Sequence, residues 1–163
     1  MQFNDIDWPT WQPRQHATLL FVVRNGAVLL IEKKRGIGAG KVNGPGGKVD
    51  DGEQPLAAAV REVEEELGVT PTDVEKVGEV LFETTGELSM RIHVFRASDC
   101  KGEARETDEA IPLWTPVDQI PYERMWPDDA EWYPLMLDRT PFEVRTLFDD
   151  DRMLGCEVIR GTR

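Results

Sequence analysis

The sequence predicts a single α+β domain in which several strands and two helices pack around one core. Three observations support this class. Turn residues separate short β-rich segments, two other segments show the apolar spacing of a helix, and 163 residues suit one domain. With 40% hydrophobic residues the chain can bury a core. We expect residues 1–163 to form this one domain, with an irregular leader over residues 1–15.

The charge balance limits the partners that we expect. The formal net charge is −12, and a field of this sign repels nucleic acid and anionic membranes. No apolar run approaches the ~20 residues of a membrane span, and the N-terminus lacks a signal pattern, so we expect a cytoplasmic protein. Cys100 and Cys156 have no metal-like spacing and are expected to be free thiols. An acidic surface is also common on soluble proteins and alone favours no function.

Seven β-rich segments are expected to form strands. Asn25-Gly26 is a strong signal for a tight hairpin turn, and Gly86 marks a second turn. Apolar residues alternate from Leu88 to Val94, which indicates a strand with one buried face. The expected strands are residues 16–23, 27–33, 74–83, 88–97, 111–117, 142–148 and 153–159.

Two segments are expected to be loops, and a third is expected to be a helix. Residues 34–48 contain too many glycines for a helix or a central strand, so we expect a loop whose backbone comes close to a ligand. Residues 99–109 are polar and charged. Residues 128–137 indicate a helix, because Asp128 and Glu131 have the spacing of a capping box, although Pro134 must kink it or fall in its early turns.

The most informative segment is a helix predicted over residues 55–67. Pro55 suits its first position, and Gly68 suits its C-terminal stop. Helical spacing places a buried stripe along one face and leaves three glutamates on the neighbouring, wetter faces. The stripe comprises Leu56, Ala59, Val60, Val63 and Leu67, and the glutamates are Glu62, Glu65 and Glu66.

The acidic face of this helix has two interpretations. Glutamate is a good helix former, so the face could simply be solvated. Three features favour a site instead: Arg61 lies among the glutamates, a glycine-rich loop precedes the helix, and adjacent carboxylates repel unless a cation lies between them. Carboxylate oxygens are the ligands that Mg²⁺ or Mn²⁺ selects.

At residues 47–69 the chain resembles the Nudix family, whose signature is G-x5-E-x7-R-E-U-x-E-E-x-G-U, with U an aliphatic residue. Every defined position is filled, by Gly47, Glu53, Arg61, Glu62, Val63, Glu65, Glu66, Gly68 and Val69. The resemblance implies the Nudix fold, an α/β/α sandwich with a mixed β-sheet between helices. It also implies hydrolysis of a nucleoside diphosphate linked to another group.

The resemblance further implies roles for these residues. Glu62, Glu65 and Glu66 would bind Mg²⁺, or Mn²⁺ in its place, with the Gly47 carbonyl as a further ligand. Arg61 and Glu53 would form a structural pair that orients the loop and the helix. Glu109, in the polar loop, aligns with an additional metal ligand. One glutamate or a metal-bound hydroxide would act as the base.

Residues 33–49 and 125–137 resemble the corresponding segments of animal-type, MutT-related family members that act on oxidised purine nucleoside triphosphates. The likeness implies a base pocket formed by Asn43, Trp126, Asp128 and Asp129, and Thr18 aligns with a further pocket residue. Lys33, a basic residue beside the glycine-rich loop, would bind any polyphosphate. Trp126 could stack on a purine and Asn43 could bond its edge. Because adjacent carboxylates raise one another's pKa, one aspartate can stay protonated and donate while the other accepts.

Other interpretations of these residues remain open. Asn43 could satisfy loop backbone, Trp126 could be ordinary core, and the two aspartates could cap a helix. The glycine-rich loop also departs from the animal-type pattern, because Ile37, Val42 and Pro45 stand where aromatics occur, and the base pocket is then less aromatic.

We expect an Mg²⁺-dependent, monomeric pyrophosphohydrolase that converts 8-oxo-dGTP and water to 8-oxo-dGMP and pyrophosphate and so sanitises the nucleotide pool. One alternative keeps the metal site but assigns a dinucleoside polyphosphate, ADP-ribose or capped RNA as substrate. Another is a noncatalytic module that senses a nucleotide, although an intact set of metal ligands argues against it.

Overall fold

A computed structural model describes residues 1–161 of the protein. Its elements, in chain order, are the 3-10 turns and helices η1 (Phe3–Asp5), η2 (Trp8–Thr10), α1 (Pro55–Leu67), η3 (Tyr122–Arg124) and α2 (Asp129–Leu137), and the strands β1 (Gln15–Arg24), β2 (Ala27–Lys33), β3 (Val42–Asn43), β4 (Gly46–Lys48), β5 (Thr70–Thr84), β6 (Ser89–Lys101), β7 (Ala110–Pro116), β8 (Phe142–Asp149) and β9 (Arg152–Arg160). The predicted α+β class is confirmed.

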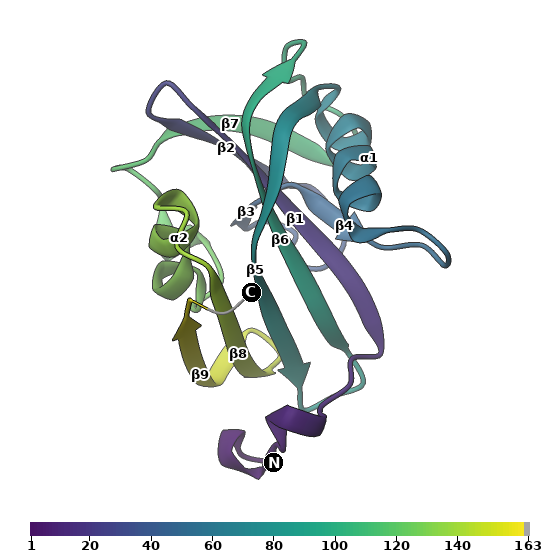
Figure 1. The fold of residues 1–163 in the computed structure, drawn as a ribbon, viewed down its shortest axis with the longest axis vertical. Helices are drawn as coiled ribbons and strands as arrows, with labels where there is room; N and C mark the ends of the chain where they lie inside the picture. The colour runs from purple at the N-terminus through teal and green to yellow at the C-terminus, as the bar shows by residue number, and fades with distance from the viewer. Residues whose placement is uncertain (162–163) are drawn as a thin grey trace.

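The strands of the described residues form one mixed sheet with the order β3-β2-β1-β6-β5-β8-β9, in which β4 also pairs with β1 and β7 with β2. The β1–β6 and β5–β8 pairs are parallel, whereas β5–β6 and β8–β9 are antiparallel. Helices α1 and α2 lie on opposite sides of the central strands (Figure 1). The arrangement is the predicted sandwich of a mixed sheet between helices.

Each helix covers its own hydrophobic layer of the core. Successive side chains of a strand point to opposite faces, so Leu20 of β1 packs in the layer that contains Val63 of α1, and Phe21 packs in the layer that contains Trp132 of α2. All four side chains are at most 1% exposed. Strand β1 therefore packs against α1, which carries the glutamates, on one face and against α2, which begins at the predicted aspartates, on the other.

The glycine-rich segment contains more regular structure than the sequence predicted. Residues 42–43 and 46–48 are short strands, and Gly46 pairs with Leu19 of β1. A Cβ atom at Gly46 would lie 1.8 Å from the Thr18 carbonyl oxygen, so only glycine permits this approach of the two backbones. The segment therefore consists of a loop followed by the two short strands β3 and β4, which add glycine-rich backbone to the sheet.

Other boundaries also differ from the predicted ones. Strands β5 and β6 are longer than the segments 74–83 and 88–97, and β6 continues into the expected loop 99–109. These strands pair over almost their whole length, with a bulge between Lys76 and Gly78. Backbone pairing therefore extends the strands through charged residues whose side chains gave no β signal. The Asn25-Gly26 turn is confirmed, with φ of 52° and 75°, both left-handed as this hairpin requires.

The leader is ordered and packs on the sheet. Trp8 and Trp11 form a small hydrophobic cluster with Leu81 of β5, and Trp11 Nε1 donates to Glu83 Oε2 at 2.9 Å. Residues 3–5 and 8–10 form 3-10 turns in place of the irregular chain that we expected. The aromatic side chains supply the apolar surface that holds the leader in place.

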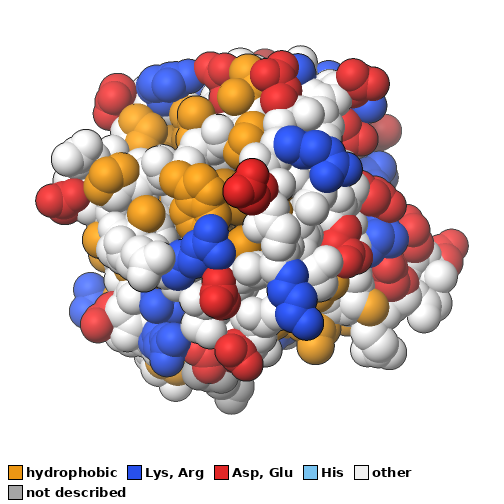
Figure 2. Space-filling model, turned by 90° about the horizontal axis from the view of Figure 1, so that it is seen from above, with side chains coloured by type: hydrophobic (Ala, Val, Ile, Leu, Met, Phe, Trp, Pro, Cys, Tyr) orange, Lys and Arg blue, Asp and Glu red, His pale blue; other side chains and the backbone are white. Residues whose placement is uncertain are grey.

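The surface in the view from above mixes both signs of charge. Figure 2 shows acidic and basic side chains interspersed around a group of hydrophobic ones, with no continuous basic area on this face. Within residues 1–161, no helix combines the length and apolar character needed to cross a membrane.

Candidate active site

Helix α1 has the predicted bounds, and its ends explain them. Pro55 occupies the first turn, and Gly68 adopts φ of 76°, the left-handed conformation that ends a helix. The Gly68 N–H donates to the Glu64 carbonyl at 2.9 Å. Leu56 differs from the predicted stripe because it is 46% exposed. It lies in the first turn of α1, whereas the buried residues of the helix begin at Ala58.

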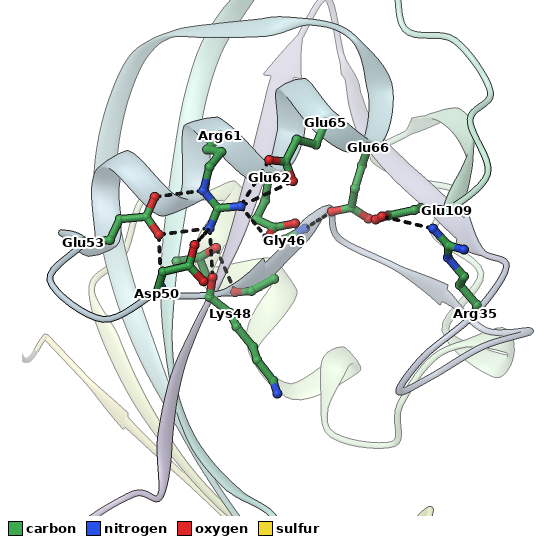
Figure 3. Close-up of polar contacts among 12 residues, drawn as sticks. Arg35, Gly46, Lys48, Asp50, Glu53, Arg61, Glu62, Glu65, Glu66 and Glu109 are labelled. Atoms are coloured by element: carbon green, nitrogen blue, oxygen red, sulfur yellow. Dashed lines mark hydrogen bonds and ion pairs between the residues drawn. The ribbon is translucent and has the colours of Figure 1, made fainter.

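Arg61 joins the loop to the helix through a two-point contact with Glu53. Arg61 Nε donates to Glu53 Oε2 at 2.8 Å, and Arg61 Nη2 donates to Glu53 Oε1 at 2.9 Å. The same Nη2 donates to the Lys48 carbonyl at 3.2 Å. These hydrogen bonds from Arg61, with a further one from the Asp50 backbone, lower the pKa of Glu53 to about 2. The contact orients the segment that leads from β4 into α1 (Figure 3).

The other face of Arg61 neutralises two of the predicted metal ligands. Arg61 Nη1 donates to Glu62 Oε1 at 3.0 Å and lies 3.3 Å from Glu65 Oε2. Glu62 also packs against Gly47: a Cβ atom added there would lie 2.3 Å from the Glu62 Cδ. Burial raises the pKa of Glu62, although Arg61 opposes the shift. Glycine at position 47 therefore leaves room for a carboxylate beside its backbone.

The expectation that Glu66 lies on a wet face is wrong, because its side chain is buried and only 1% exposed. Glu66 Oε1 accepts the Gly46 N–H at 2.9 Å. Gly46 and Gly47 of β4 have no side chains, which leaves room for the Glu66 carboxyl. Burial, together with the charges of Glu62 and Glu109, raises the pKa of Glu66 to about 7, although the Gly46 hydrogen bond and the charge of Lys33 oppose the shift. A buried carboxyl surrounded by like charges favours a nearby cation.

Glu109 approaches this cluster from the segment before β7. Its carboxylate points toward that of Glu66 (Figure 3), and Arg35 Nη2 lies 3.4 Å from Glu109 Oε1. Within residues 1–161, no three Asp, Glu, His or Cys side chains form a ready-made metal cluster. The arginines hold the acidic side chains as ion pairs. The residues nevertheless fit a hard divalent cation. Oxygen donors from α1, β4 and Glu109 converge on one region, and the negative charges of the carboxylates repel one another there.

A cavity of about 430 Å³ lies next to β4, and every predicted substrate residue lines it. Thr18, Lys33, Asn43, Trp126, Asp128 and Asp129 all line it. Gly46 and Gly47 line it as well, so the cavity adjoins the backbone against which Glu62 and Glu66 pack. A molecule in this cavity can therefore extend toward the acidic helix.

Asp128 and Asp129 are buried in the cavity wall, at 5% and 6% exposure. The predicted capping box is absent, because the Asp128 side chain caps no backbone N–H of α2. Asp128 Oδ2 instead accepts from Trp132 Nε1 at 3.0 Å, and Asp129 Oδ2 accepts the Trp126 N–H at 3.2 Å. Asp128 itself has helical backbone angles, φ −80° and ψ −16°, in place of the extended angles of a typical N-cap residue.

Burial raises the pKa of both carboxyls in this pair. The Trp132 hydrogen bond opposes the shift at Asp128. At Asp129 the negative charge of Asp128 adds to the effect of burial, so the pKa of Asp129 lies well above its ordinary value. Burial and the mutual repulsion of the two charges disfavour the doubly ionised pair, so the two carboxyls can share one proton.

The remaining predicted residues are held by the glycine loop and its neighbours. Asn43 Nδ2 donates to the Lys41 carbonyl at 3.1 Å, and Lys33 Nζ donates to the Ile37 carbonyl at 2.7 Å. The Thr18 hydroxyl donates to the Gly47 carbonyl at 3.4 Å. Trp126 packs edge-on against Phe82, with ring centroids 6.1 Å apart.

Sequence reasoning missed most of the apolar wall of the cavity. Phe82 and Val80 of β5, Met90 and Ile92 of β6 and Tyr133 of α2 line it. The alternation from Leu88 to Val94 identified a buried face, but it could not show that part of this face borders a cavity. A purine-sized ligand would meet both this apolar wall and the buried acid pair.

Comparisons with known proteins support the family assignment. The NUDIX domain model matches residues 13–136. The chain is 50% identical to the oxidized purine nucleoside triphosphate hydrolase of Danio rerio over 77% of this chain and 81% of that protein. It is 42% identical to the protein of that name from Mus musculus, over 82% and 86% of the two chains.

A solved structure agrees with the fold. The mutator MutT protein from Bacillus halodurans superposes with a TM-score of 0.80 at 25% identity, covering 88% of this chain and 97% of that one. Nudix hydrolases generally require divalent metal ions, which agrees with the oxygen donors on α1. The domain match, the two relatives and this fold together show that the chain belongs to the Nudix hydrolase family.

Proposed function

We propose that the protein hydrolyses oxidised purine nucleoside triphosphates, with 8-oxo-dGTP as substrate and 8-oxo-dGMP and pyrophosphate as products. The observation that carries the proposal is the buried acid pair, Asp128 and Asp129, in a cavity that opens beside the acidic helix. The relatives from Danio rerio and Mus musculus bear the name of this activity.

The acid pair suits the edge of an oxidised guanine. A protonated Asp129 donates a hydrogen bond, whereas a charged Asp128 accepts one, so the two together match a base edge that carries both an acceptor and N–H donors. Asn43 adds a side-chain amide that can donate and accept. Trp126 offers a ring for stacking, and Lys41 Nζ already lies 5.3 Å from its centroid. Base contacts of this kind discriminate strongly because a wrong base leaves buried polar groups unpaired.

The acidic helix suits the cleavage of the phosphate chain. Glu62, Glu65, Glu66, Glu109 and the Gly47 carbonyl would hold a divalent cation, which we propose to be Mg²⁺, with Mn²⁺ as a substitute. When bound, the cation neutralises phosphate charge and lowers the pKa of a bound water. Arg61 and Glu53 fix the loop that presents Gly47. Burial raises the pKa of Glu66 to about 7 in the absence of a cation, and a bound cation would stabilise the charged form of this carboxyl.

Lys33 serves the same reaction from the cavity side. Lys33 lines the cavity, and its positive charge lowers the pKa of Glu66. A lysine between a base pocket and a metal-binding helix is well placed to bind a polyphosphate. We propose a monomeric enzyme with a small-molecule nucleotide as its partner, located in the cytoplasm and without a nucleic acid ligand, in accord with the net charge of −12.

The experiment that tests this function is a pyrophosphate and phosphate release assay with Mg²⁺. The panel contains 8-oxo-dGTP, dGTP, a diadenosine polyphosphate, ADP-ribose and capped RNA. We expect 8-oxo-dGTP to give the highest kcat/KM, with the monophosphate and pyrophosphate as products. Preference for ADP-ribose or for a dinucleoside polyphosphate would replace the proposed substrate, and no turnover of any member would favour a sensing module.

A further inference from the structure

Residues 102–109, which lead from β6 to β7, close the C-terminal end of α1. The last carbonyl groups of a helix have no partner within it and need one from elsewhere. The Arg105 N–H donates to the Leu67 carbonyl at 3.0 Å, and the Thr107 hydroxyl donates to the Glu66 carbonyl at 2.7 Å. This segment therefore holds two of the final carbonyls of α1, and one of them belongs to a proposed metal ligand.

The Thr107 hydroxyl has a second partner in the same segment. The Glu109 N–H donates to Thr107 Oγ1 at 3.2 Å, and a hydroxyl can donate and accept at the same time. The Thr107 N–H also donates to the Ala110 carbonyl at 3.0 Å, across Glu109. One side chain thus joins the backbone of Glu66 to the backbone of Glu109, and the proposed function assigns both residues to one cation.

Backbone contacts fix the position of Glu109. Its carbonyl accepts the Lys34 N–H at 2.9 Å, and its N–H is held by Thr107. Its side chain is 44% exposed, and the side chain of Arg35, which pairs with it at 3.4 Å, is 66% exposed. An exposed ion pair of this kind restrains a carboxylate only weakly. The place of the Glu109 carboxylate therefore depends on the backbone that carries it.

Glu66 is held in a different way. Its carboxyl is buried and accepts the Gly46 N–H at 2.9 Å. The Glu109 carboxylate points toward it (Figure 3), and like charges at close range repel each other. This repulsion tends to move Glu109 away from the buried carboxyl whenever no cation lies between them. The Thr107 hydroxyl opposes that movement, because it ties the two backbones together.

We propose that Thr107 is a positioning residue for the metal site, because its hydroxyl fixes the backbone of Glu109 beside that of Glu66. A cation binds more tightly when its ligands are already in place, so a hydrogen bond that orients a ligand contributes to metal affinity. Thr107 acts through Glu109 and not through a contact of its own with the cation. The inference rests on the proposed function, since it assumes that Glu66 and Glu109 bind the same cation.

The test removes the hydroxyl but keeps the shape of the side chain, in Thr107→Val. A Mn²⁺ titration followed by electron paramagnetic resonance, without nucleotide, measures metal binding. We expect the dissociation constant for Mn²⁺ to rise roughly tenfold, the usual size of the effect when a hydrogen bond that orients a metal ligand is lost. Thr107→Ala should change it in the same direction. Thr107→Ser keeps the hydroxyl and should stay within about twofold of the wild type.

Thr70→Val is the matched control. The Thr70 hydroxyl lies near the same end of α1 and donates to Glu64 Oε2 at 2.7 Å, but Glu64 has no part in the proposed metal site. This variant also loses a threonine hydroxyl that bonds the helix, and it should bind Mn²⁺ as the wild type does.

A second background tests whether Thr107 acts through Glu109. In Glu109→Gln, the Thr107→Val change should weaken Mn²⁺ binding much less than in the wild type, because the ligand that Thr107 positions has lost its charge. A full effect in that background would overturn the inference. Wild-type affinity in Thr107→Val, or an equal loss in Thr107→Ser, would also overturn it, even if the melting temperature falls.

The titration separates metal binding from substrate choice. Because it contains no nucleotide, its result decides the role of Thr107 even if the enzyme prefers a substrate other than 8-oxo-dGTP. A wild type that binds no Mn²⁺ would refute the proposed metal site, and the inference with it.

Discussion

Arg61 and Glu53 form a two-point contact, with Nε and Nη2 of the guanidinium 2.8 and 2.9 Å from the two carboxylate oxygens. The remaining nitrogen, Nη1, faces Glu62 and Glu65. One side chain therefore orients the loop before α1 and also neutralises two carboxylates of the proposed metal-binding region.

Replacing Arg61 by lysine should lower kcat/KM for 8-oxo-dGTP by roughly 10²-fold, because an ammonium cannot make both contacts of the planar fork. Steady-state kinetics at saturating Mg²⁺ measure the effect. Arg24→Lys is the control, since Arg24 pairs with Asp99 on the surface. Equal activity of the Arg61 and Arg24 variants would contradict the orienting role.

Glu66→Gln should lower turnover by at least about 10²-fold while the protein remains folded, because the amide keeps the shape of the carboxyl but lacks the charge that holds a hard cation and does not accept a proton. Circular dichroism checks the fold, and a Mn²⁺ titration followed by electron paramagnetic resonance measures metal binding. In the control Glu64→Gln, an exposed residue that bonds Thr70, activity should persist. Full activity of Glu66→Gln would exclude Glu66 from the metal site.

Asp128→Ala should abolish the preference for 8-oxo-dGTP over dGTP, because it removes the acceptor of the acid pair. The isosteric Asp128→Asn separates loss of charge from loss of volume and should have the same direction of effect. The ratio of the two kcat/KM values is the measurement. An unchanged ratio in both variants would mean that another residue reads the base.

The acid pair also predicts a pH dependence. Burial and the charge of Asp128 raise the pKa of Asp129, so a proton on this carboxyl is lost at a higher pH than from an ordinary aspartate. Loss of the donor should weaken binding, and the KM for 8-oxo-dGTP should therefore increase toward alkaline pH. Asp129→Asn keeps an N–H donor at every pH, so its KM should not vary in this way. The same alkaline rise in Asp129→Asn would assign it to another group.

His93 predicts a separate effect of pH on stability. Burial and the charge of Lys76 lower its pKa from 6.5 to about 4. Between these values the unfolded chain binds a proton that the folded protein does not bind. The free energy of unfolding should therefore fall by about 3 kcal/mol as the pH drops through this window, and level off below it. Urea unfolding of the wild type and of His93→Gln measures the difference, and an equal slope in both would refute it.

Local signals were sufficient to predict α1 and its bounds. Pro55 and Gly68 define its ends within one short segment, and the spacing of Glu62, Glu65 and Glu66 follows from the same stretch. Helical periodicity did not show that Glu66 is buried, because its environment depends on Gly46, which lies 20 residues earlier and offers a backbone N–H in place of a side chain.

The cavity wall was less predictable because its residues meet through non-local pairing. Phe82 stands opposite Met90 in the β5–β6 register, and both line the cavity with Trp126, from a segment far along the chain. Sequence identified Trp126 only through resemblance to relatives. The capping spacing of Asp128 and Glu131 was misleading, since the buried Trp132 Nε1 offers Asp128 a partner that a local pattern does not reveal.

The most direct test of the account is the selectivity of the wild-type enzyme between 8-oxo-dGTP and dGTP. The two nucleotides share the triphosphate and differ only in the base, so their kcat/KM ratio reports the cavity and not the acidic helix. We expect a ratio of at least about tenfold in favour of the oxidised base, the factor that one hydrogen bond of about 1.4 kcal/mol provides. A ratio near one would contradict the claim that Asn43, Asp128 and Asp129 read an oxidised purine.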